Sequence, residues 1–425
     1  MRSRCDTRWI AIAAVLLSGC AATRQYPAPP ILPPTAIVEI GKPADNGPYD
    51  ASQTRVAAAK PRNVLVLSGG GANGAYVAGV LKGWTASGTR PQFDVVTGVS
   101  TGALIAPLAF LGPEYDGNLE RLYTSMRQEN IIRPRLLWLD SLVSSQPLEQ
   151  QIAACVTPDI LSKIAEAHRQ GRRLYVGTTN LDTKSLVVWD LGAIAARNTP
   201  ESKELFKKVL LASCSVPGLL PPAPIDVEID GQRFTELHVD GGVTACVFLQ
   251  PAMLGVGPRG ELPPNAGPLA VHVLVAGRLQ QPIAPTKREL VTIAAESMNT
   301  VLQSKLQGEL TKLFSLARYA GGDFKLAGIP EDCACPKSSM LFEPAAMRAM
   351  FDSGYRGGRD GSAWHSYPPG LEAEMMARPR TDTRFATAEN AALVRPRPSE
   401  RLAASAAEAE SLSGHPGRTE ASDRR

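Results

Sequence analysis

Two strand–turn–helix units follow one another early in the chain, and they constrain its fold more than any other feature. Val64–Leu67 is a continuous β-prone apolar run, and Phe93–Thr97, which begins with Phe93-Asp94, is expected as a second buried strand. Each leads through a glycine-rich turn into a helical segment, Ala75–Trp84 or Ala103–Leu111. Strands that are apolar along their whole length are typical of a sheet covered on both faces. Two such units in succession also require parallel pairing with crossover helices. The sequence therefore predicts an α/β fold around a parallel sheet.

Later segments extend this pattern over most of the chain. Further strands are expected at 174–179, 186–189, 238–239 and 269–276. Apolar residues at helical spacing predict one or two long amphipathic helices over 289–320. Hydrophobic residues make up 44% of the 425 positions, which is enough for a sizeable core.

The first residues resemble an export signal rather than part of a fold. Arg2, Arg4 and Arg8 precede a short apolar run that ends in Leu17-Ser18-Gly19-Cys20. This run is too short for a stable membrane span. Its final tetrad resembles a bacterial lipobox, in which the cysteine is lipidated and becomes the mature N-terminus. The alternative is an ordinary secretory signal that ends near a cysteine by chance.

The lipobox resemblance implies a location and a domain plan. Alanine rather than aspartate follows Cys20, which favours the outer membrane of a bacterial cell envelope, with the acyl chains as anchor. Residues 1–19 are then the signal peptide, and the proline-rich stretch 20–62 is an extended tether. We expect the catalytic domain at 63–370. The tail at 371–425 is poor in large apolar residues, so we expect it to be disordered.

Charge and cysteine content exclude several classes of partner. The formal net charge is only +4, and no basic run contains interleaved aromatic residues, so we expect no nucleic-acid partner. Cys333 and Cys335 lack a second Cys or His pair nearby, which argues against zinc. We expect neither a metal nor a cofactor. The sequence leaves the oligomeric state open.

The second glycine turn carries a candidate nucleophile. Gly98-Val99-Ser100-Thr101-Gly102 lies between a buried strand and a helix, and it has the G-x-S-x-G pattern. A serine on such a sharp turn is exposed at the top of the sheet, and flanking glycines allow the strand and helix to approach closely. The helix N-terminus favours developing negative charge. Ser100 is therefore the candidate catalytic serine.

The first glycine turn admits three interpretations. Gly69, Gly71 and Gly74 fit the G-x-G-x-x-G pattern of a dinucleotide site. That site also needs an acid at the carboxyl end of the second strand, whereas Asp94 stands at its start. A second interpretation is an oxyanion hole, because the backbone N–H groups of Gly69, Gly70 and Gly71 can face one oxygen with no side chain between them. The third is a tight turn without a ligand.

Two residues are candidates for the general base. His272 lies in an apolar strand-like run, and the order Ser100, Asp240, His272 would suit a Ser-Asp-His triad. A histidine in a core strand is also a common structural residue. Asp240-Gly241-Gly242 is a tight turn after a strand, and a desolvated carboxylate close to the serine can itself act as base.

Taken together and in order, the turns at Gly69–Gly74, Gly98–Gly102 and Asp240–Gly242 resemble the patatin-like phospholipase family. The stretch from Ala212 to Pro222 and the segment from Thr178 to Thr183 resemble motifs of the same family. The resemblance covers roughly Asn63 to Ala276. It implies a three-layer α/β/α sandwich with a mostly parallel sheet.

The same resemblance implies a lipid acyl hydrolase. Ser100 would be the nucleophile and Asp240 the base of a dyad, Gly69, Gly70 and Gly71 would form the oxyanion hole, and fatty acyl esters of phospholipids or lysophospholipids would be cleaved through an acyl-enzyme. Many family members have Arg or Lys where Asn73 stands. That departure keeps open a catalytically decayed, membrane-tethered scaffold on the same fold. A Ser-His-Asp carboxylesterase is a further alternative.

Overall fold

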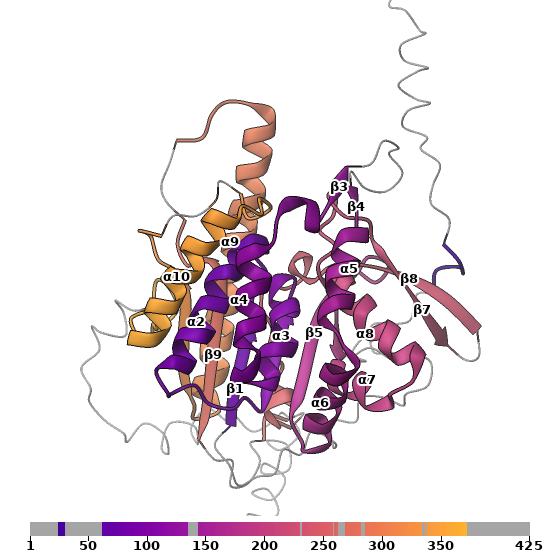
Figure 1. Ribbon diagram of the computed structural model, residues 1–425, viewed down its shortest axis with the longest axis horizontal. Helices are drawn as coiled ribbons and strands as arrows, with labels where there is room; N and C mark the ends of the chain where they lie inside the picture. The colour runs from indigo at the N-terminus through magenta and orange to yellow at the C-terminus, as the bar shows by residue number, and fades with distance from the viewer. Residues whose placement is uncertain are drawn as a thin grey trace, which may run out of the picture. The chain divides into compact units, whose positions relative to one another are not determined.

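The computed structural model describes most of the expected catalytic domain and a short segment before it (Figure 1). The signal peptide with Cys20, most of the expected tether and the tail beyond Leu371 lie outside the described residues. The described residues are 24–29, 62–134, 143–229, 232–257, 259–261, 268–281, 285–333, 336 and 338–371.

A mixed sheet forms the centre of the fold. Its strand order is β10-β9-β1-β2-β5-β8-β7, with β6 also paired to β5. The strands from β10 to β5 run parallel, while β6, β7 and β8 pair in antiparallel fashion. The strands are β1 (Arg62–Leu67), β2 (Val95–Val99), β5 (Arg173–Asn180), β6 (Ser185–Asp190), β7 (Ala223–Ile229), β8 (Gln232–Asp240), β9 (Leu269–Arg278) and β10 (Asp323–Ile329), with a small separate hairpin of β3 (Arg133–Pro134) and β4 (Val143–Ser144).

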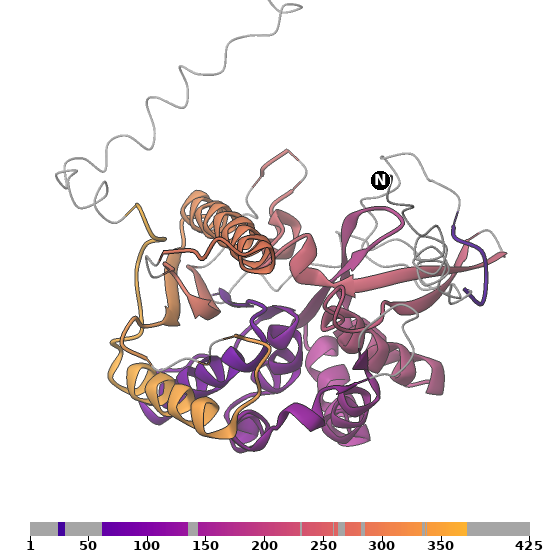
Figure 2. The same ribbon diagram turned by 90° about the horizontal axis from the view of Figure 1, so that it is seen from above.

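Helices cover both faces of this sheet (Figure 2). One long helix, α9 (Leu290–Tyr319), lies on one face beside β9 and β10, and the other helices lie on the opposite face. No helix among the described residues combines the length and the apolar character of a membrane span. The remaining helices are α2 (Gly74–Ala86), α3 (Thr101–Leu111), α4 (Asp116–Ser125), α5 (Gln146–Cys155), α6 (Pro158–Arg169), α7 (Leu191–Arg197), α8 (Pro200–Ser213) and α10 (Pro344–Asp360).

The backbones of α2 and α10 are in direct contact, which fixes the C-terminal end of the domain. A Cβ atom added to Gly79 would lie 2.0 Å from the carbonyl oxygen of Phe351, and one added to Gly358 would lie 2.3 Å from that of Val80. Glycine is therefore required at these crossing points, because any side chain would force the helices apart.

The observed architecture confirms the expected three-layer α/β/α sandwich with a mostly parallel sheet. The segment over 289–320 is one long helix, which is one of the two expected arrangements. The strand expected at 238–239 is the end of the longer β8. Strands β3, β4, β7 and β10 were not expected.

Candidate active site

Ser100 occupies a strained turn between β2 and α3. Its backbone has φ 54° and ψ −123°, a region that residues with side chains rarely adopt. Cβ atoms added to Gly98 and Gly102 would lie 2.5 Å and 2.6 Å from backbone carbonyl oxygens, so only glycine fits on either side of the turn. This is the geometry expected of a nucleophile elbow.

The pairing of β5 brings Asp240 to Ser100. One edge of β5 is paired along 175–180 with β6. The other edge of β5 pairs with two strands in succession. It pairs with β2 as far as Gly177, which lies opposite Val99, and with β8 from Thr178, which lies opposite Asp240. Because β2 runs parallel and β8 antiparallel to β5, the carboxyl ends of β2 and β8 meet head to head. The candidate nucleophile and base are the residues at that meeting point.

The carboxylate of Asp240 is buried beside the hydroxyl of Ser100. It accepts a hydrogen bond from the hydroxyl of Ser100 and one of 2.7 Å from the backbone N–H of Gly242. Burial raises the pKa of Asp240 to about 6, while these two hydrogen bonds and the nearby charge of Lys305 oppose the rise. A carboxylate with this pKa is ionised at neutral pH and is a stronger base than an ordinary aspartate.

The glycine loop after β1 lies against the serine. A Cβ atom added to Gly69 would lie 3.0 Å from Cβ and 3.7 Å from Oγ of Ser100. Gly70 and Gly71 have φ values of 153° and 54° and bring their backbone close to neighbouring carbonyls. Among the described residues, the N–H groups of these three glycines donate no hydrogen bond. The loop therefore has free donors beside Ser100, as an oxyanion hole requires.

The rival dinucleotide interpretation of this loop has no acid in the required place. Asp94 stands just before β2, and its carboxylate accepts a hydrogen bond of 2.9 Å from the N–H of Asn63 at the amino end of the sheet. A ribose above the carboxyl ends of the strands would lie at the opposite edge. At the third glycine, Gly74, an added Cβ would meet the side chains of Thr101 and Tyr123 at 2.6 Å, so this glycine serves helix packing.

The C-terminal end of α8 contacts both candidate catalytic residues, a role that was not predicted from the sequence. The hydroxyl of Ser213 accepts a hydrogen bond of 2.9 Å from the N–H of Ser100 and donates one of 2.7 Å to the carbonyl of Gly177. The carbonyl of Ser215 accepts one of 2.9 Å from the N–H of Asp240. The Ala212–Pro222 motif was visible in the sequence, but its contacts depend on the fold.

The structure does not bring His272 to the site. Its ring packs against Trp84 and Trp364, with ring centroids 4.9 Å and 5.9 Å away, on a strand position paired with Leu65. Burial lowers the pKa of His272 to about 4. The described contacts of this histidine include none with Ser100, so they favour the structural role over the triad.

An apolar pocket opens from Ser100. It contains about 550 Å³ of space between atoms, including its open mouth, and its walls are almost entirely apolar. A second apolar pocket shares Leu104, Met126 and Leu148 with the first and extends to Ile160. Apolar walls that begin at a nucleophile suit a hydrocarbon chain joined to a reacting ester.

Asn73 follows the three glycines of the loop and is a neutral residue. The side-chain oxygen of Asn73 is buried and has no hydrogen-bond partner among the described residues.

In the part of the chain that the structure describes, no group of three or more His, Cys, Asp or Glu side chains is arranged to hold a metal ion.

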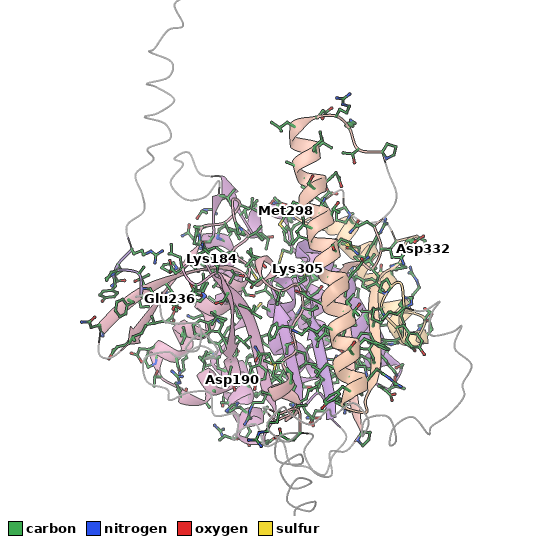
Figure 3. The ribbon with its side chains drawn as sticks, turned by 180° about the vertical axis from the view of Figure 1, so that it is seen from behind. Lys184, Asp190, Glu236, Met298, Lys305 and Asp332 are labelled. Atoms are coloured by element: carbon green, nitrogen blue, oxygen red, sulfur yellow. The ribbon has the colours of Figure 1, made fainter. Side chains whose placement is uncertain are left out.

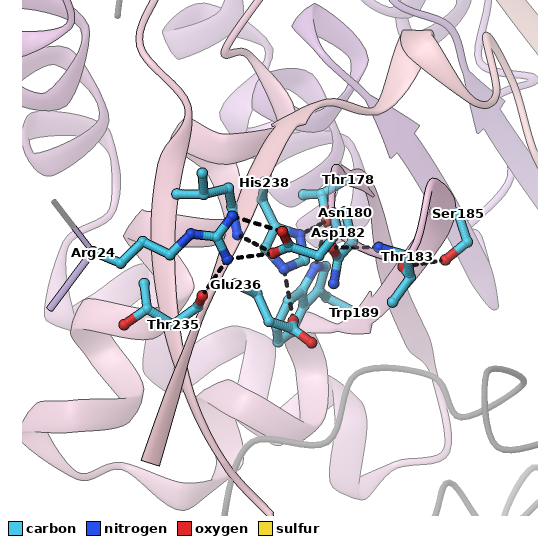
Figure 4. A network of polar contacts seen from close by, with 11 residues as sticks. Arg24, Thr178, Asn180, Asp182, Thr183, Ser185, Trp189, Thr235, Glu236 and His238 are labelled. Atoms are coloured by element: carbon cyan, nitrogen blue, oxygen red, sulfur yellow. Dashed lines mark hydrogen bonds and ion pairs between the residues drawn. The ribbon is translucent and has the colours of Figure 1, made fainter. Parts of the chain in front are cut away.

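A segment of the expected tether lies against β8, the strand that ends at Asp240 (Figure 4). The guanidinium of Arg24 donates to both carboxylate oxygens of Asp182, at 2.9 Å and 2.6 Å. The N–H of Tyr26 donates a hydrogen bond of 3.1 Å to the hydroxyl of Thr235, and the N–H of Thr235 donates one of 3.0 Å to the carbonyl of Pro27. Residues 24–29 are thus fixed to the domain.

Comparisons with known proteins agree with this geometry. Residues 65–253 match the family model described as patatin-like phospholipase. A cUMP-AMP-activated phospholipase of Escherichia coli is 52% identical over 64 residues, which is 14% of this chain and 20% of that protein. The chain therefore aligns with about one fifth of the length of this curated relative.

Two solved structures show partial similarity. VipD from Legionella pneumophila gives a TM-score of 0.32 at 11% identity, over 83% of this chain and 74% of VipD. The type III effector protein ExoU gives 0.25 at 14% identity, over 83% of this chain and 61% of ExoU, which is less than two thirds of its length. Residues 65–253 therefore form a patatin-like phospholipase domain.

Proposed function

We propose that this protein is a lipid acyl hydrolase that cleaves fatty acyl esters of phospholipids or lysophospholipids. Ser100 is the nucleophile and Asp240 the general base. The observation that carries this proposal is the hydrogen bond from the Ser100 hydroxyl to the buried carboxylate of Asp240, at the mouth of an apolar pocket.

Acylation begins with a proton transfer. Asp240 takes the hydroxyl proton of Ser100 as Oγ bonds to the ester carbonyl carbon. The carbonyl oxygen becomes negative and is stabilised by the N–H groups of Gly69, Gly70 and Gly71. The carbon–oxygen bond to the alcohol then breaks, and the alcohol leaves with the proton from Asp240. An acyl-enzyme on Ser100 remains.

Deacylation repeats these steps with water. Asp240 removes a proton from a water molecule whose oxygen attacks the acyl carbon. The bond between that carbon and Ser100 Oγ breaks, and Oγ recovers the proton from Asp240. The fatty acid leaves through the apolar pocket, and every proton removed has been returned.

We also propose that the protein is exported and anchored at the bacterial outer membrane through a lipidated Cys20. The support is the tetrad Leu17-Ser18-Gly19-Cys20 after a basic and apolar leader. A lipid anchor would place the enzyme beside its substrate. Mass spectrometry of the mature N-terminus, in wild type and in Cys20→Ser, tests this location.

Ester hydrolysis is tested on the full chain with a p-nitrophenyl acyl ester. Ser100→Ala and Asp240→Ala should each reduce kcat by about a thousandfold or more, as loss of a nucleophile or its base does. His272→Ala is the matched control and should retain activity. Full activity of Asp240→Ala with loss in His272→Ala would replace the dyad by the triad.

A fluorophosphonate probe distinguishes an enzyme from a decayed scaffold. The probe reacts only with an activated serine, so the folded wild type should be labelled at Ser100 and Ser100→Ala should not. Folded wild-type protein without a label would support the scaffold. Comparison of cellular lipids between wild type and Ser100→Ala would then identify the head group and acyl position of the substrate.

A further inference from the structure

The N-terminal half of α9 has a stripe of apolar side chains that are exposed in the described structure. Leu290, Met298 and Val301 are 84%, 59% and 61% exposed. With Ala294 they stand at positions i, i+4, i+8 and i+11 of one helix, so they share one face. These four residues are referred to below as the α9 stripe.

This stripe is separate from the face that packs α9 onto the sheet. The buried residues of the C-terminal half, Leu306, Leu310, Leu313 and Ala317, form their own stripe at the same kind of spacing. At about 100° per residue, the two stripes point about 130° apart around the helix. The four residues of the α9 stripe are therefore not an extension of the core beyond its edge.

The α9 stripe points to the side of the catalytic turn. Lys305 is the next position of the stripe, four residues after Val301, and its Nζ donates to the carbonyls of Gly242 and Val243 at 3.0 Å and 2.9 Å. Val243 is itself 48% exposed. An apolar surface thus begins beside the Asp240 turn and continues up the helix.

The same surface projects beyond the site. β9 ends at the carboxyl edge of the parallel strands, and α9 runs back from there to the start of β10. At 1.5 Å per residue, Leu290 lies about 22 Å along the helix from Lys305. Figure 3 shows Met298 above Lys305 on this projecting part of the helix.

Charge is segregated around the stripe. Lys287 and Arg288 are exposed just before the helix begins, and Lys305 continues the stripe at its other end. The two acidic residues of this part, Glu289 and Glu296, fall on the opposite face by the same helical spacing. An apolar stripe with basic residues at both ends matches a bilayer with anionic head groups.

We propose that the α9 stripe and Val243 form a membrane-contacting surface that brings the mouth of the active site to a lipid bilayer. This inference rests on the proposed function for its purpose, which is access of a bilayer ester to Ser100. A protein partner fits less well, because a stable protein interface uses about 20 to 30 residues on each side. Beside the stripe, the described part of α9 adds only Ile293, Leu302 and Tyr319 as large exposed apolar side chains. The bilayer is also the phase that contains the proposed substrate.

Vesicle binding by the full chain tests the surface without the proposed lipid anchor. All proteins carry Cys20→Ser, and binding to phosphatidylcholine vesicles with and without phosphatidylglycerol is measured by sedimentation. Met298→Glu with Val301→Glu should weaken binding about tenfold or more, because two charges then face the hydrocarbon boundary. The control is Thr292→Glu with Asn299→Glu, which adds the same charge on the opposite face and should bind as the parent does.

Three measurements decide the outcome. Thermal unfolding midpoints within a few degrees of the parent show that both variants are folded. Equal vesicle binding by the stripe variant and the control variant would overturn the surface, as would a parent dimer that the stripe variant converts to monomer in light scattering. Hydrolysis of a soluble p-nitrophenyl ester is measured in parallel. Its absence in the parent would refute the proposed function while vesicle binding still decides the surface.

Discussion

The N–H of Ser100 donates a hydrogen bond of 2.9 Å to the hydroxyl of Ser213. This bond links the strained turn at Ser100 to β5, because the same hydroxyl donates a hydrogen bond to the carbonyl of Gly177. Ser213 is therefore in place to position the proposed nucleophile, and this contribution can be separated from simple packing.

Replacement of Ser213 by Ala should lower kcat about ten- to a hundredfold with little change in KM. The elbow loses its buried acceptor, and small displacements of a nucleophile have large effects on rate. Ser215→Ala is the matched control, because Ser215 contacts Asp240 through its main-chain carbonyl, which the substitution keeps. Equal kinetics for the two variants would contradict the positioning role of Ser213.

The pH dependence of hydrolysis should report the ionisation of Asp240. The base must be deprotonated to accept the serine proton, and the pKa of Asp240 is raised to about 6 by burial. We expect kcat/KM to rise with pH through about 6 and then to level off. A profile already level at pH 5 would show that another group limits the reaction.

Removal of the Asp240 charge should stabilise the protein at neutral pH. A raised pKa in the folded state means that folding disfavours the ionised form, so the carboxylate weakens the fold once the pH exceeds about 6. Below the unfolded-state pKa of about 4 both states are protonated and the penalty vanishes. Asp240→Asn should therefore raise the unfolding midpoint at pH 8 but not at pH 3.5.

At about 1.4 kcal/mol per pKa unit, the gain in free energy of unfolding from Asp240→Asn is on the order of a few kcal/mol. Thermal unfolding monitored by circular dichroism at several pH values measures it. A midpoint difference between the two proteins that does not change with pH would contradict the ionisation argument.

The apolar pocket should set the length of the acyl chain. Leu148 lines both neighbouring pockets, so the larger side chain of Leu148→Phe takes up space where they adjoin. The ratio of kcat/KM for a decanoate ester to that for a butyrate ester should fall about tenfold. Leu181→Phe, at an exposed position that lines neither pocket, is the control. An unchanged ratio would place the acyl chain elsewhere.

Strands that are apolar throughout were predictable, whereas half-exposed strands were not. The runs at Val64–Leu67 and Phe93–Thr97 fall in or next to β1 and β2, which are covered on both sides. Along β7 buried and exposed residues alternate, and β7 pairs with β8 in an antiparallel hairpin. Such strands lack a continuous apolar run, so a search for buried strands passes over them.

The sequence by itself determined the turns on which the chemistry depends. Gly98 and Gly102 stand on either side of Ser100, and Gly69, Gly70 and Gly71 form the upstream loop. A Cβ atom at any of these positions would lie close to neighbouring atoms, and the glycines that meet this requirement are visible in the sequence. The sequence also placed Asp240 in a tight turn, but it left both Asp240 and His272 as candidates for the general base.

Only the tertiary structure decided which of the two residues, Asp240 or His272, lies beside Ser100. β5 passes from β2 to β8 between Gly177 and Thr178, and this change of partner places Asp240 opposite the end of the strand that leads to Ser100. The contact between the Ser213 hydroxyl and Ser100 also depends on the fold, and so does the direction of the α9 stripe. Turn geometry is a local property of the chain, whereas strand pairing joins residues far apart in sequence.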